Sequence, residues 1–367
     1  MRRSGWIALI ALAITGTWWW SSSRTPPPKP RGSDHRVIVL GFDGLDPALL
    51  GEARAAGRMP NFSELAAQGH LQTLATTDPP QSPVAWSSFA TGTGPGEHGV
   101  FDFLHRDAEH YAPEFSIATQ LPPETLDLFG WQMPIRDGAL VTRRQGMPFW
   151  LRAEADGLRT AVMRVPVTYP ADPITHMLSG MGVPDLLGTQ GTYTLVANHL
   201  VADAESGGRV LMVKTSEDGV VRTELAGPAS PTSGEAMTVP LTLAPAGDAV
   251  AIALGGHDLT LKAGAWSDWL PLDFRFLGLG TVRGMVRLHL VAGFPRVRLY
   301  VTPIQVDPTA PVLPISHPPE DAARIAERIG RFHTLGMPEE TWSMNQGHLD
   351  EVAWLASVRT TLAEGEA

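Results

Sequence analysis

The chain of 367 residues contains no cysteine. This absence excludes disulfide bonds, thiolate catalysis, cysteine-based metal sites and lipid anchoring through a cysteine. Charged residues make up only 18% of the chain, and the 38 acidic side chains outnumber the 28 basic ones. The net charge of −10 argues against a nucleic-acid partner, because non-specific binding of nucleic acids relies on Lys and Arg.

Several common catalytic patterns are also missing. No Gly-x-Ser-x-Gly occurs, which argues against an α/β-hydrolase triad. Residues 94–99 fit Gly-x-Gly-x-x-Gly, but they follow a predicted helix rather than a strand, so a tight turn is favoured over a dinucleotide site. The hydrophobic content of 43% is typical of a globular protein, and the length allows two domains or one large domain with an insert.

The amino-terminal segment has the features of a membrane-targeting sequence. Arg2 and Arg3 precede an uncharged stretch that ends in three tryptophans at residues 18–20. We interpret residues 1–22 as a signal anchor, with a cleaved signal peptide as the alternative. Residues 23–35 form a proline-rich linker. This predicts a single-pass protein of the inner membrane with a periplasmic or extracytoplasmic domain, or a secreted protein if the signal is cleaved.

The first segment that suggests chemistry is VIVLGFDG, residues 37–44. Residues 37–42 are apolar and partly β-branched, which predicts a buried parallel strand. The strand would end at Asp43, and open α/β sheets bind ligands at the carboxyl ends of their strands. Gly44 permits a sharp turn and Pro47 suits the first turn of a helix. From these residues alone, Asp43 could equally be a helix cap or a metal ligand.

The second segment places a serine at the start of a predicted helix. Ser82 precedes Pro83, and residues 84–91 read as a helix that Gly92 closes. Free backbone N–H groups and the positive end of the helix dipole would favour a phosphate beside Ser82. A serine before proline at this position is also an ordinary helix cap, and that alternative stays open.

Together the two segments resemble the alkaline phosphatase superfamily, in its type I phosphodiesterase/nucleotide pyrophosphatase branch. The matching stretches are VIVLGFDGLDP, MPNFSELAAQGHLQTL, PPQSPVAWSSFATGTGPGEHGVFDFLHRD and FWLRAEADGLRTAVMRVPVTYPADPITHMLSGMGVPD. The resemblance implies that Asp43 binds a metal and that Ser82, beside the metal, is the nucleophile. It also implies two divalent ions, with zinc expected and manganese as the alternative.

Three further residues are candidates for substrate binding. His98 lies in the glycine-rich turn after the helix, and His105 and Arg106 follow shortly after it. Arginine matches the geometry of phosphate. The alternatives are a histidine that bonds its own backbone at position 98, and solvated or paired surface charges at the other two positions.

The sequence also departs from the family pattern. Relatives complete the two-metal site with an Asp-x-x-x-His, an Asp-His-Gly turn and a final His, all downstream of an insert. The adjacent pair Asp34-His35 lies in the linker, and Asp172 and His176 fall in a segment that matches another part of the pattern. We therefore expect a truncated member of the family that lacks the metal-ligand half, with a separately encoded C-terminal half as its partner. Alone, this chain is expected to be weakly active or inactive.

The expected fold is α/β, with a doubly wound, mostly parallel sheet that is incomplete, and a β-rich insert domain. Residues 36–204 are predicted to form the N-terminal half of this core, because strand and helix patterns alternate there. Residues 205–316 read as the β-rich insert or cap, with alternation in VRLHLVAGFPRVRLYV typical of a half-exposed antiparallel sheet. Residues 317–367 are predicted to return to the core as helices, truncated.

Three functions remain open from the sequence. The first is a membrane-tethered, metal-dependent hydrolase of phosphoesters that uses Ser82 as its nucleophile. The second is a phosphotransferase acting on head groups at the outer membrane face. The third is a non-catalytic remnant or binding module. The first two imply a small phosphoester or a lipid head group as substrate.

Overall fold

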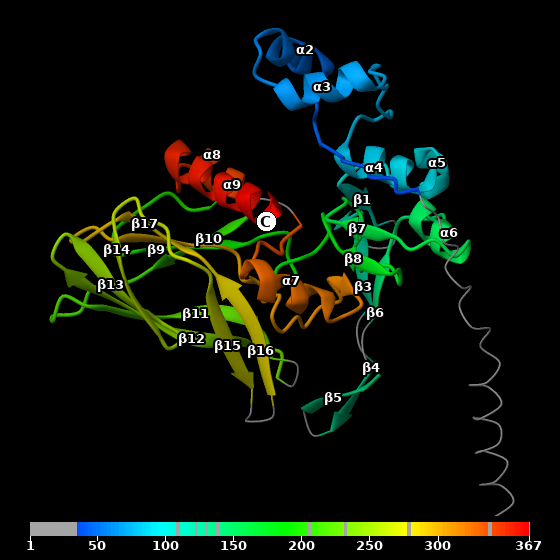
Figure 1. Cartoon of the computed structure of the whole chain (residues 1–367). Coiled ribbons are helices and arrows are strands. Elements are labelled where there is room, and N and C mark those ends of the chain that lie inside the picture. The colour runs from blue at the N-terminus through cyan, green and yellow to red at the C-terminus, as the bar shows by residue number, and fades with distance from the viewer. Residues whose placement is uncertain are drawn as a thin grey trace, which may run out of the picture.

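The computed structural model describes residues 35–107, 111–121, 124–128, 131–136, 139–204, 207–230, 233–276, 280–336 and 340–366. They form a mixed α/β structure with several small sheets, as Figure 1 shows. The mixed α/β class is confirmed, but no large doubly wound sheet is seen in these ranges. The predicted signal anchor at residues 1–22 lies outside them, as does the linker apart from His35. Within the described part of the chain, no helix is both long and apolar enough to span a membrane.

Residues 37–42 do not form the buried strand that their sequence predicts. The segment is extended, but no described strand pairs with it, and its side chains are exposed, with Val37 at 87% and Ile38 at 81%. A parallel strand is stable in a core only when neighbours satisfy its backbone and cover both faces. The described residues supply no such neighbours here. Residues 71–76 are likewise irregular and exposed.

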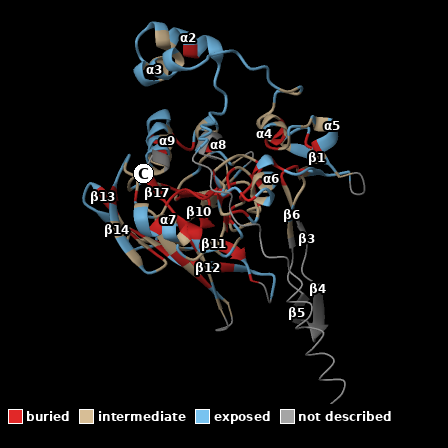
Figure 2. Cartoon of the chain, turned by 45° about the vertical axis from the view of Figure 1, so that its right-hand side comes forward, coloured by how far each residue is buried: buried red, intermediate tan, exposed pale blue. Residues whose placement is uncertain are grey.

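The helices near the amino terminus follow their local signals closely. Proline stands in the first turn of α2 (Pro47–Ala55), α3 (Pro60–Gln68) and α4 (Ser82–Thr91). The last of these ends at Gly92, in the left-handed conformation that glycine adopts easily. The short helix α5 (Pro95–His98) follows directly. Figures 1 and 2 show α2 and α3 set apart from the body of the protein and largely exposed.

Three antiparallel strand pairs occupy the segment expected to be loop-rich. The pairs are β1 (Leu104–Arg106) with β2 (Pro113–Phe115), β3 (Ala118–Leu121) with β6 (Ala139–Thr142), and β4 (Glu124–Leu128) with β5 (Trp131–Arg136). Figure 1 shows β4 and β5 projecting away from α4.

A small sheet connects the phosphodiesterase-like segment to the later helices. Its order is β20 (Ser316–His317), β8 (His176–Leu178), β7 (Ala161–Met163), and β7 and β8 are parallel. Helix α6 (Phe149–Ala155) packs Trp150 into the core with Val162 and Met177. Helix α7 (Asp321–Ile329) lies beside the same sheet, and the ring of His176 bonds Asp321 at 2.7 Å.

The largest core belongs to the β-rich region, which contains three sheets. One is the antiparallel series β11 (Val221–Ala229), β12 (Ala236–Ala246), β13 (Ala249–Leu254), β14 (His257–Lys262). The second has the order β15 (Leu270–Phe276), β16 (Gly280–Val286), β19 (Gln305–Val306). The third has the order β10 (Gly208–Met212), β9 (Tyr193–Ala197), β18 (Arg298–Val301), β17 (Leu288–Ala292). Alternate residues of these strands are buried between the sheets, as period-2 patterning requires.

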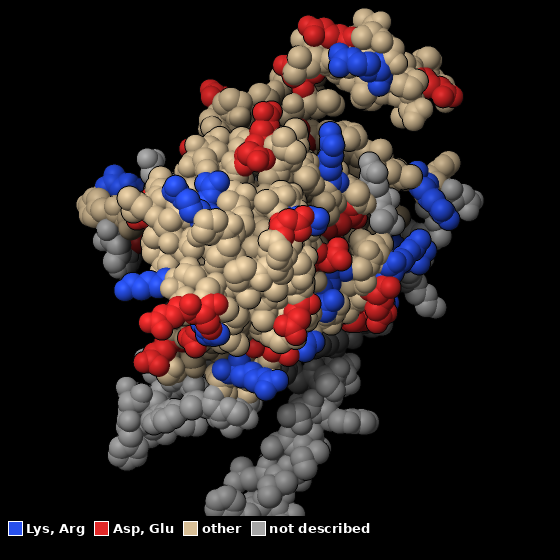
Figure 3. All heavy atoms as spheres, turned by 90° about the vertical axis from the view of Figure 1, so that its left-hand side faces the viewer, with Lys and Arg blue, Asp and Glu red and all other residues tan. Residues whose placement is uncertain are grey.

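The β-rich region begins before residue 205, where the sequence placed its start. Strand β9 precedes that position and pairs with β18, so a division at residue 204 falls inside one sheet. Helices α8 (Glu340–Asn345) and α9 (Glu351–Glu366) follow α7. The indole of Trp269 donates to Glu364 Oε1 at 2.8 Å, which ties the end of α9 to the β-rich region. Figure 3 shows acidic and basic groups interspersed on this side of the molecule.

Candidate functional site

The structure brings Asp43 and Ser82 together. The hydroxyl of Ser82 donates to Asp43 Oδ2 with an oxygen–oxygen distance of 3.0 Å, although the residues are 39 positions apart. Asp43 is exposed and Ser82 is partly exposed, so solvent reaches the pair. The extended segment 37–42 runs past α4 in Figure 1 and delivers Asp43 to the start of that helix.

Neither residue serves as a helix cap, the alternative that the sequence left open. Helix α2 is capped by Asp46, whose Oδ1 accepts from the backbone N–H groups of Ala48 and Leu49 at 2.7 and 2.9 Å. Helix α4 has Gln81 at its N-cap, and no side chain caps it. The carboxylate of Asp43 and the hydroxyl of Ser82 are therefore engaged with each other rather than with helix ends.

Trp86 is a third member of the site, which the sequence did not single out. Its indole Nε1 donates to Asp43 Oδ1 at 3.0 Å, so each carboxylate oxygen accepts one side-chain hydrogen bond. Its spacing was the available signal, because residues four apart lie on the same face of a helix, and Trp86 follows Ser82 by four positions. The pair of donors on α4 fixes the orientation of the carboxylate.

Gly41 leaves room for this tryptophan. A Cβ atom at position 41 would lie 2.4 Å from Cη2 of Trp86, well inside van der Waals contact. We expect Gly41→Ala to displace the indole and break its bond to Asp43, at a cost of about 1 kcal/mol for an exposed hydrogen bond to a charged group. The check is the indole N–H resonance of Trp86 in protein labelled with ¹⁵N-tryptophan, assigned with Trp86→Phe.

A matched control for Gly41→Ala is Gly51→Ala. No atom lies within 4 Å of a Cβ built at position 51, so this variant should leave the Trp86 resonance in place. An unchanged resonance in Gly41→Ala would show that the indole does not occupy the space beside Gly41.

Ser82 is the first residue of α4, a helix of 10 residues. The N-terminal end of a helix carries a partial positive charge and backbone N–H groups without intrahelical partners. An anion that approaches the Ser82 hydroxyl from solvent therefore meets a favourable field. The arrangement combines the Ser82 hydroxyl, which can act as a nucleophile, with the Asp43 carboxylate, which accepts its hydrogen bond and orients it. The dipole of α4 adds a weak attraction for anions.

His98 lies in the interior of the protein. Its ring is fully buried, with Nε2 2.9 Å from Ser88 Oγ, and Nδ1 accepts from the backbone N–H of Val100 at 3.2 Å. Because Nδ1 accepts, Nε2 carries the proton and donates to Ser88. Burial, and then the charge of Arg144, lowers the pKa of His98. The ring thus bonds its own turn, as the alternative interpretation of the sequence allowed.

His105 and Arg106 lie on strand β1. His105 Nε2 is 3.3 Å from Glu114 Oε2 on the paired strand, and Arg143 also contacts that carboxylate. The guanidinium of Arg106 lies over the ring of Tyr111, 4.6 Å from its centroid. Neither side chain bonds Asp43 or Ser82, so the structure gathers only two of the five candidate residues into one site.

The described residues do not by themselves make a metal site. Among them, no group of three His, Asp or Glu side chains is arranged to hold an ion. Asp43 and Ser82 offer two adjacent oxygen atoms, the ligand type that hard divalent ions accept, but a zinc site uses four ligands. The pair fits one corner of such a site and not the whole of it.

Comparison with known protein families identifies the part of the chain that contains this site. Residues 37–214 match the family described as type I phosphodiesterase / nucleotide pyrophosphatase. This range includes Asp43, Ser82 and Trp86, and it ends just after strand β10. No curated protein and no solved structure matches the chain at a significant level.

Part of the chain is therefore similar to a family of phosphoester hydrolases. The match over residues 37–214 covers part of the chain and confirms the resemblance seen in the sequence. The family implies a phosphoester substrate, and its members typically use metals.

Proposed function

We propose that this domain hydrolyses phosphoesters with Ser82 as the nucleophile and Asp43 as the group that holds and deprotonates it. The observation that carries the proposal is the 3.0 Å hydrogen bond from Ser82 to Asp43 at the start of α4, inside a phosphodiesterase-family domain. Trp86 holds the second carboxylate oxygen and so keeps Asp43 directed at the hydroxyl.

In the proposed reaction the Ser82 oxygen attacks phosphorus and the bond from phosphorus to the leaving oxygen breaks. The hydroxyl proton passes to Asp43 Oδ2, and the leaving oxygen takes a proton from water. Water then attacks the phosphoserine and gives a proton to the hydroxide left by the first step. The bond from phosphorus to the Ser82 oxygen breaks, the proton on Asp43 returns to that oxygen, and phosphate or a phosphomonoester is released. If an alcohol replaces water in the second step, the same residues catalyse phosphotransfer.

The metal requirement extends the proposal beyond the described residues. Asp43 and Ser82 would supply two ligands, and we propose zinc because of the resemblance to the family. Manganese is the alternative, since both donors are oxygen atoms, which manganese accepts readily. A bound metal would supply Lewis-acid stabilisation of charge on the phosphoryl oxygens. We propose that a separately encoded C-terminal half supplies the remaining ligands. The unpaired segment 37–42, directly before Asp43, supports this because a further strand could pair with it.

The location and substrate are part of the same proposal. Residues 1–22 would tether the domain to the inner membrane and place it in the periplasm, with a cleaved, secreted form as the alternative. There the substrate would be a small phosphoester or a lipid head group. Separation of membrane and soluble fractions, with an epitope tag on the protein, measures the tether directly.

The test of the proposed chemistry is turnover of p-nitrophenyl phosphate and bis(p-nitrophenyl) phosphate by purified protein with added zinc or manganese. We expect trace turnover from this chain alone, because two ligands hold a metal poorly. Ser82→Ala should reduce that turnover to the rate without enzyme, since it removes the attacking oxygen. Ser216→Ala, at an exposed serine of the β-rich region, is the matched control and should keep the wild-type rate.

Each outcome of this assay is informative. Turnover that survives in Ser82→Ala would contradict the assignment of the nucleophile. Fast turnover that depends on Ser82 would show that this chain needs no further ligands and would contradict the second half of the proposal. Phosphorylation of added glycerol in place of phosphate release would assign the protein to the phosphotransferases.

A further inference from the structure

A second polar cavity lies in the β-rich region, where the sheet of β11–β14 meets the sheet of β15, β16 and β19. Its volume is about 530 Å³. One wall is backbone and apolar surface from residues 238–240 of β12 with Gly255, and the other is the outward face of β15 and β16. None of its lining residues belongs to the Asp43–Ser82 site.

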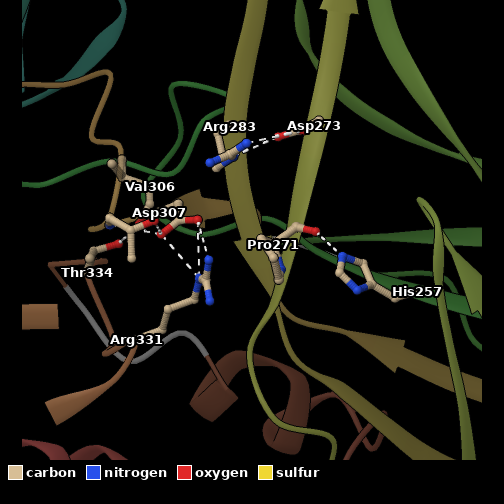
Figure 4. Close-up of polar contacts among 9 residues, drawn as sticks. His257, Pro271, Asp273, Arg283, Val306, Asp307, Arg331 and Thr334 are labelled. Atoms are coloured by element: carbon tan, nitrogen blue, oxygen red, sulfur yellow. Dashed lines mark hydrogen bonds and ion pairs between the residues drawn. The ribbon is translucent and has the colours of Figure 1, made fainter. Parts of the chain in front are cut away.

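Three arginines line this cavity, Arg275, Arg283 and Arg331. Arg275 and Arg283 come from neighbouring strands of one antiparallel pair, on the face opposite to the buried Phe274. Arg331 enters from the turn after α7. Segments far apart in sequence therefore present guanidinium groups to one space, which Figure 4 shows for Arg283 and Arg331.

Two of the guanidiniums are oriented by carboxylates and keep donors to spare. Arg283 bonds Asp273 through Nε and Nη2 at 2.7 and 3.3 Å. Arg331 bonds the fully buried Asp307 through the same two nitrogens, at 3.2 to 3.3 Å. Since a guanidinium has five N–H donors, the Nη1 end of each arginine remains available.

Arg275 has no such partner. It is exposed, and it makes no hydrogen bond or ion pair with any described residue. The hydrogen bond from Arg283 is the main cause of the lowered pKa of Asp273, and the charge of Arg275 lowers that pKa further. Three positive charges thus face two carboxylates, one of them buried behind Arg331, which leaves the cavity with an unbalanced positive charge.

His257 adds a further polar group to the cavity. Its Nε2 lies 2.7 Å from the carbonyl oxygen of Pro271, and because a carbonyl only accepts, Nε2 is the donor. That bond, drawn in Figure 4, joins β14 to β15 and fixes the ring.

We propose that this cavity binds a small oxyanion ligand, a compound carrying phosphate or carboxylate groups. Arginine forks match both groups, and two of these forks are already fixed in place by carboxylates, so little conformational freedom is lost when a ligand binds. The cavity volume accommodates a ligand larger than a single inorganic ion. This ligand site is independent of the proposed catalysis.

The test is calorimetric titration of the full chain with pyrophosphate, inorganic phosphate and succinate at low ionic strength. The protein carries Asp43→Asn and Ser82→Ala, so that anions at the start of α4 do not contribute. We expect saturable binding that Arg275→Ala weakens about fivefold to tenfold and Arg275→Glu abolishes, because a charge-assisted bond is lost. The relative affinities of pyrophosphate and succinate distinguish a phosphate ligand from a carboxylate ligand.

The control variants change the same charge elsewhere. Arg209 is exposed on β10, outside the cavity, and makes no bond with a described residue, so Arg209→Ala and Arg209→Glu should bind like the parent protein. Binding that falls equally in the Arg209 and Arg275 variants would reflect net charge alone and overturn the proposal. Binding that Arg275→Glu leaves intact would also overturn it, as would the absence of saturable binding by all three probes.

Discussion

Arg331→Met is expected to lower the free energy of unfolding by about 3 kcal/mol, because it leaves a buried carboxylate without its counter-charge. Asp307 is fully buried, and Arg331 neutralises it through two nitrogens. The carboxylate keeps only the backbone N–H and hydroxyl of Thr309, at 2.9 and 2.7 Å. These two bonds are the reason to expect the lower part of the range for broken buried ion pairs. Urea denaturation followed by circular dichroism measures the change.

The control for this variant is an arginine whose ion pair is exposed. Arg222 pairs with Asp218 at 2.7 Å, but both side chains are at least half exposed, so Arg222→Met should change stability far less than Arg331→Met does. Adding Asp307→Asn to Arg331→Met removes the unpaired charge and should recover part of the loss. Equal effects at positions 222 and 331 would mean that burial of Asp307 does not govern the energetics of the pair.

Gly180→Ala is expected to destabilise the protein by about 3 kcal/mol through steric overlap. A Cβ atom at this position would lie 2.4 Å from the carbonyl oxygen of Arg164 and 2.5 Å from that of Val165. These are backbone atoms, which cannot rotate away as a side chain can. The two segments are also joined by the hydrogen bond from Gly180 N to Thr168 Oγ1 at 3.0 Å, so separating them breaks further contacts.

Gly188→Ala separates the steric effect from the loss of a glycine. Gly188 has a φ of +78°, and no atom lies within 4 Å of a Cβ built there. Its substitution should cost only about 1 kcal/mol, the price of a left-handed conformation for an alanine. Urea midpoints of the two variants provide the comparison, and a Gly180→Ala midpoint no lower than that of Gly188→Ala would refute the predicted overlap.

Local signals in the sequence predicted the helices and most strands of the β-rich region. Proline favours the first turn of a helix and glycine its end, so α2 begins at the expected Pro47 and α4 covers the expected residues 84–91 and ends at Gly92. Alternation of apolar and polar residues along the chain likewise indicates strands such as β12 and β13, in which buried and more exposed side chains alternate. These features depend on neighbours within a few residues.

The prediction of a doubly wound sheet was wrong because such a sheet depends on strands that are distant in sequence. The apolar run at residues 37–42 indicates a preference for burial. A buried parallel strand needs a neighbouring strand on either side, and the described residues provide none. The meeting of Asp43 and Ser82 was predictable only through resemblance to a family, since nothing local joins them. Trp86 was missed because a tryptophan reads as packing, whereas its indole N–H also donates.

The place of β9 determines how this protein can be divided for expression. Because β9 is hydrogen-bonded to β18 on one side and β10 on the other, it is an interior strand of its sheet. Cloning a fragment that stops at residue 204 would strip β9 of both neighbours and uncover Tyr193 and Leu195, which are now fully buried. Recombinant work on the segment that matches the phosphodiesterase family should therefore retain the β-rich region in the same polypeptide.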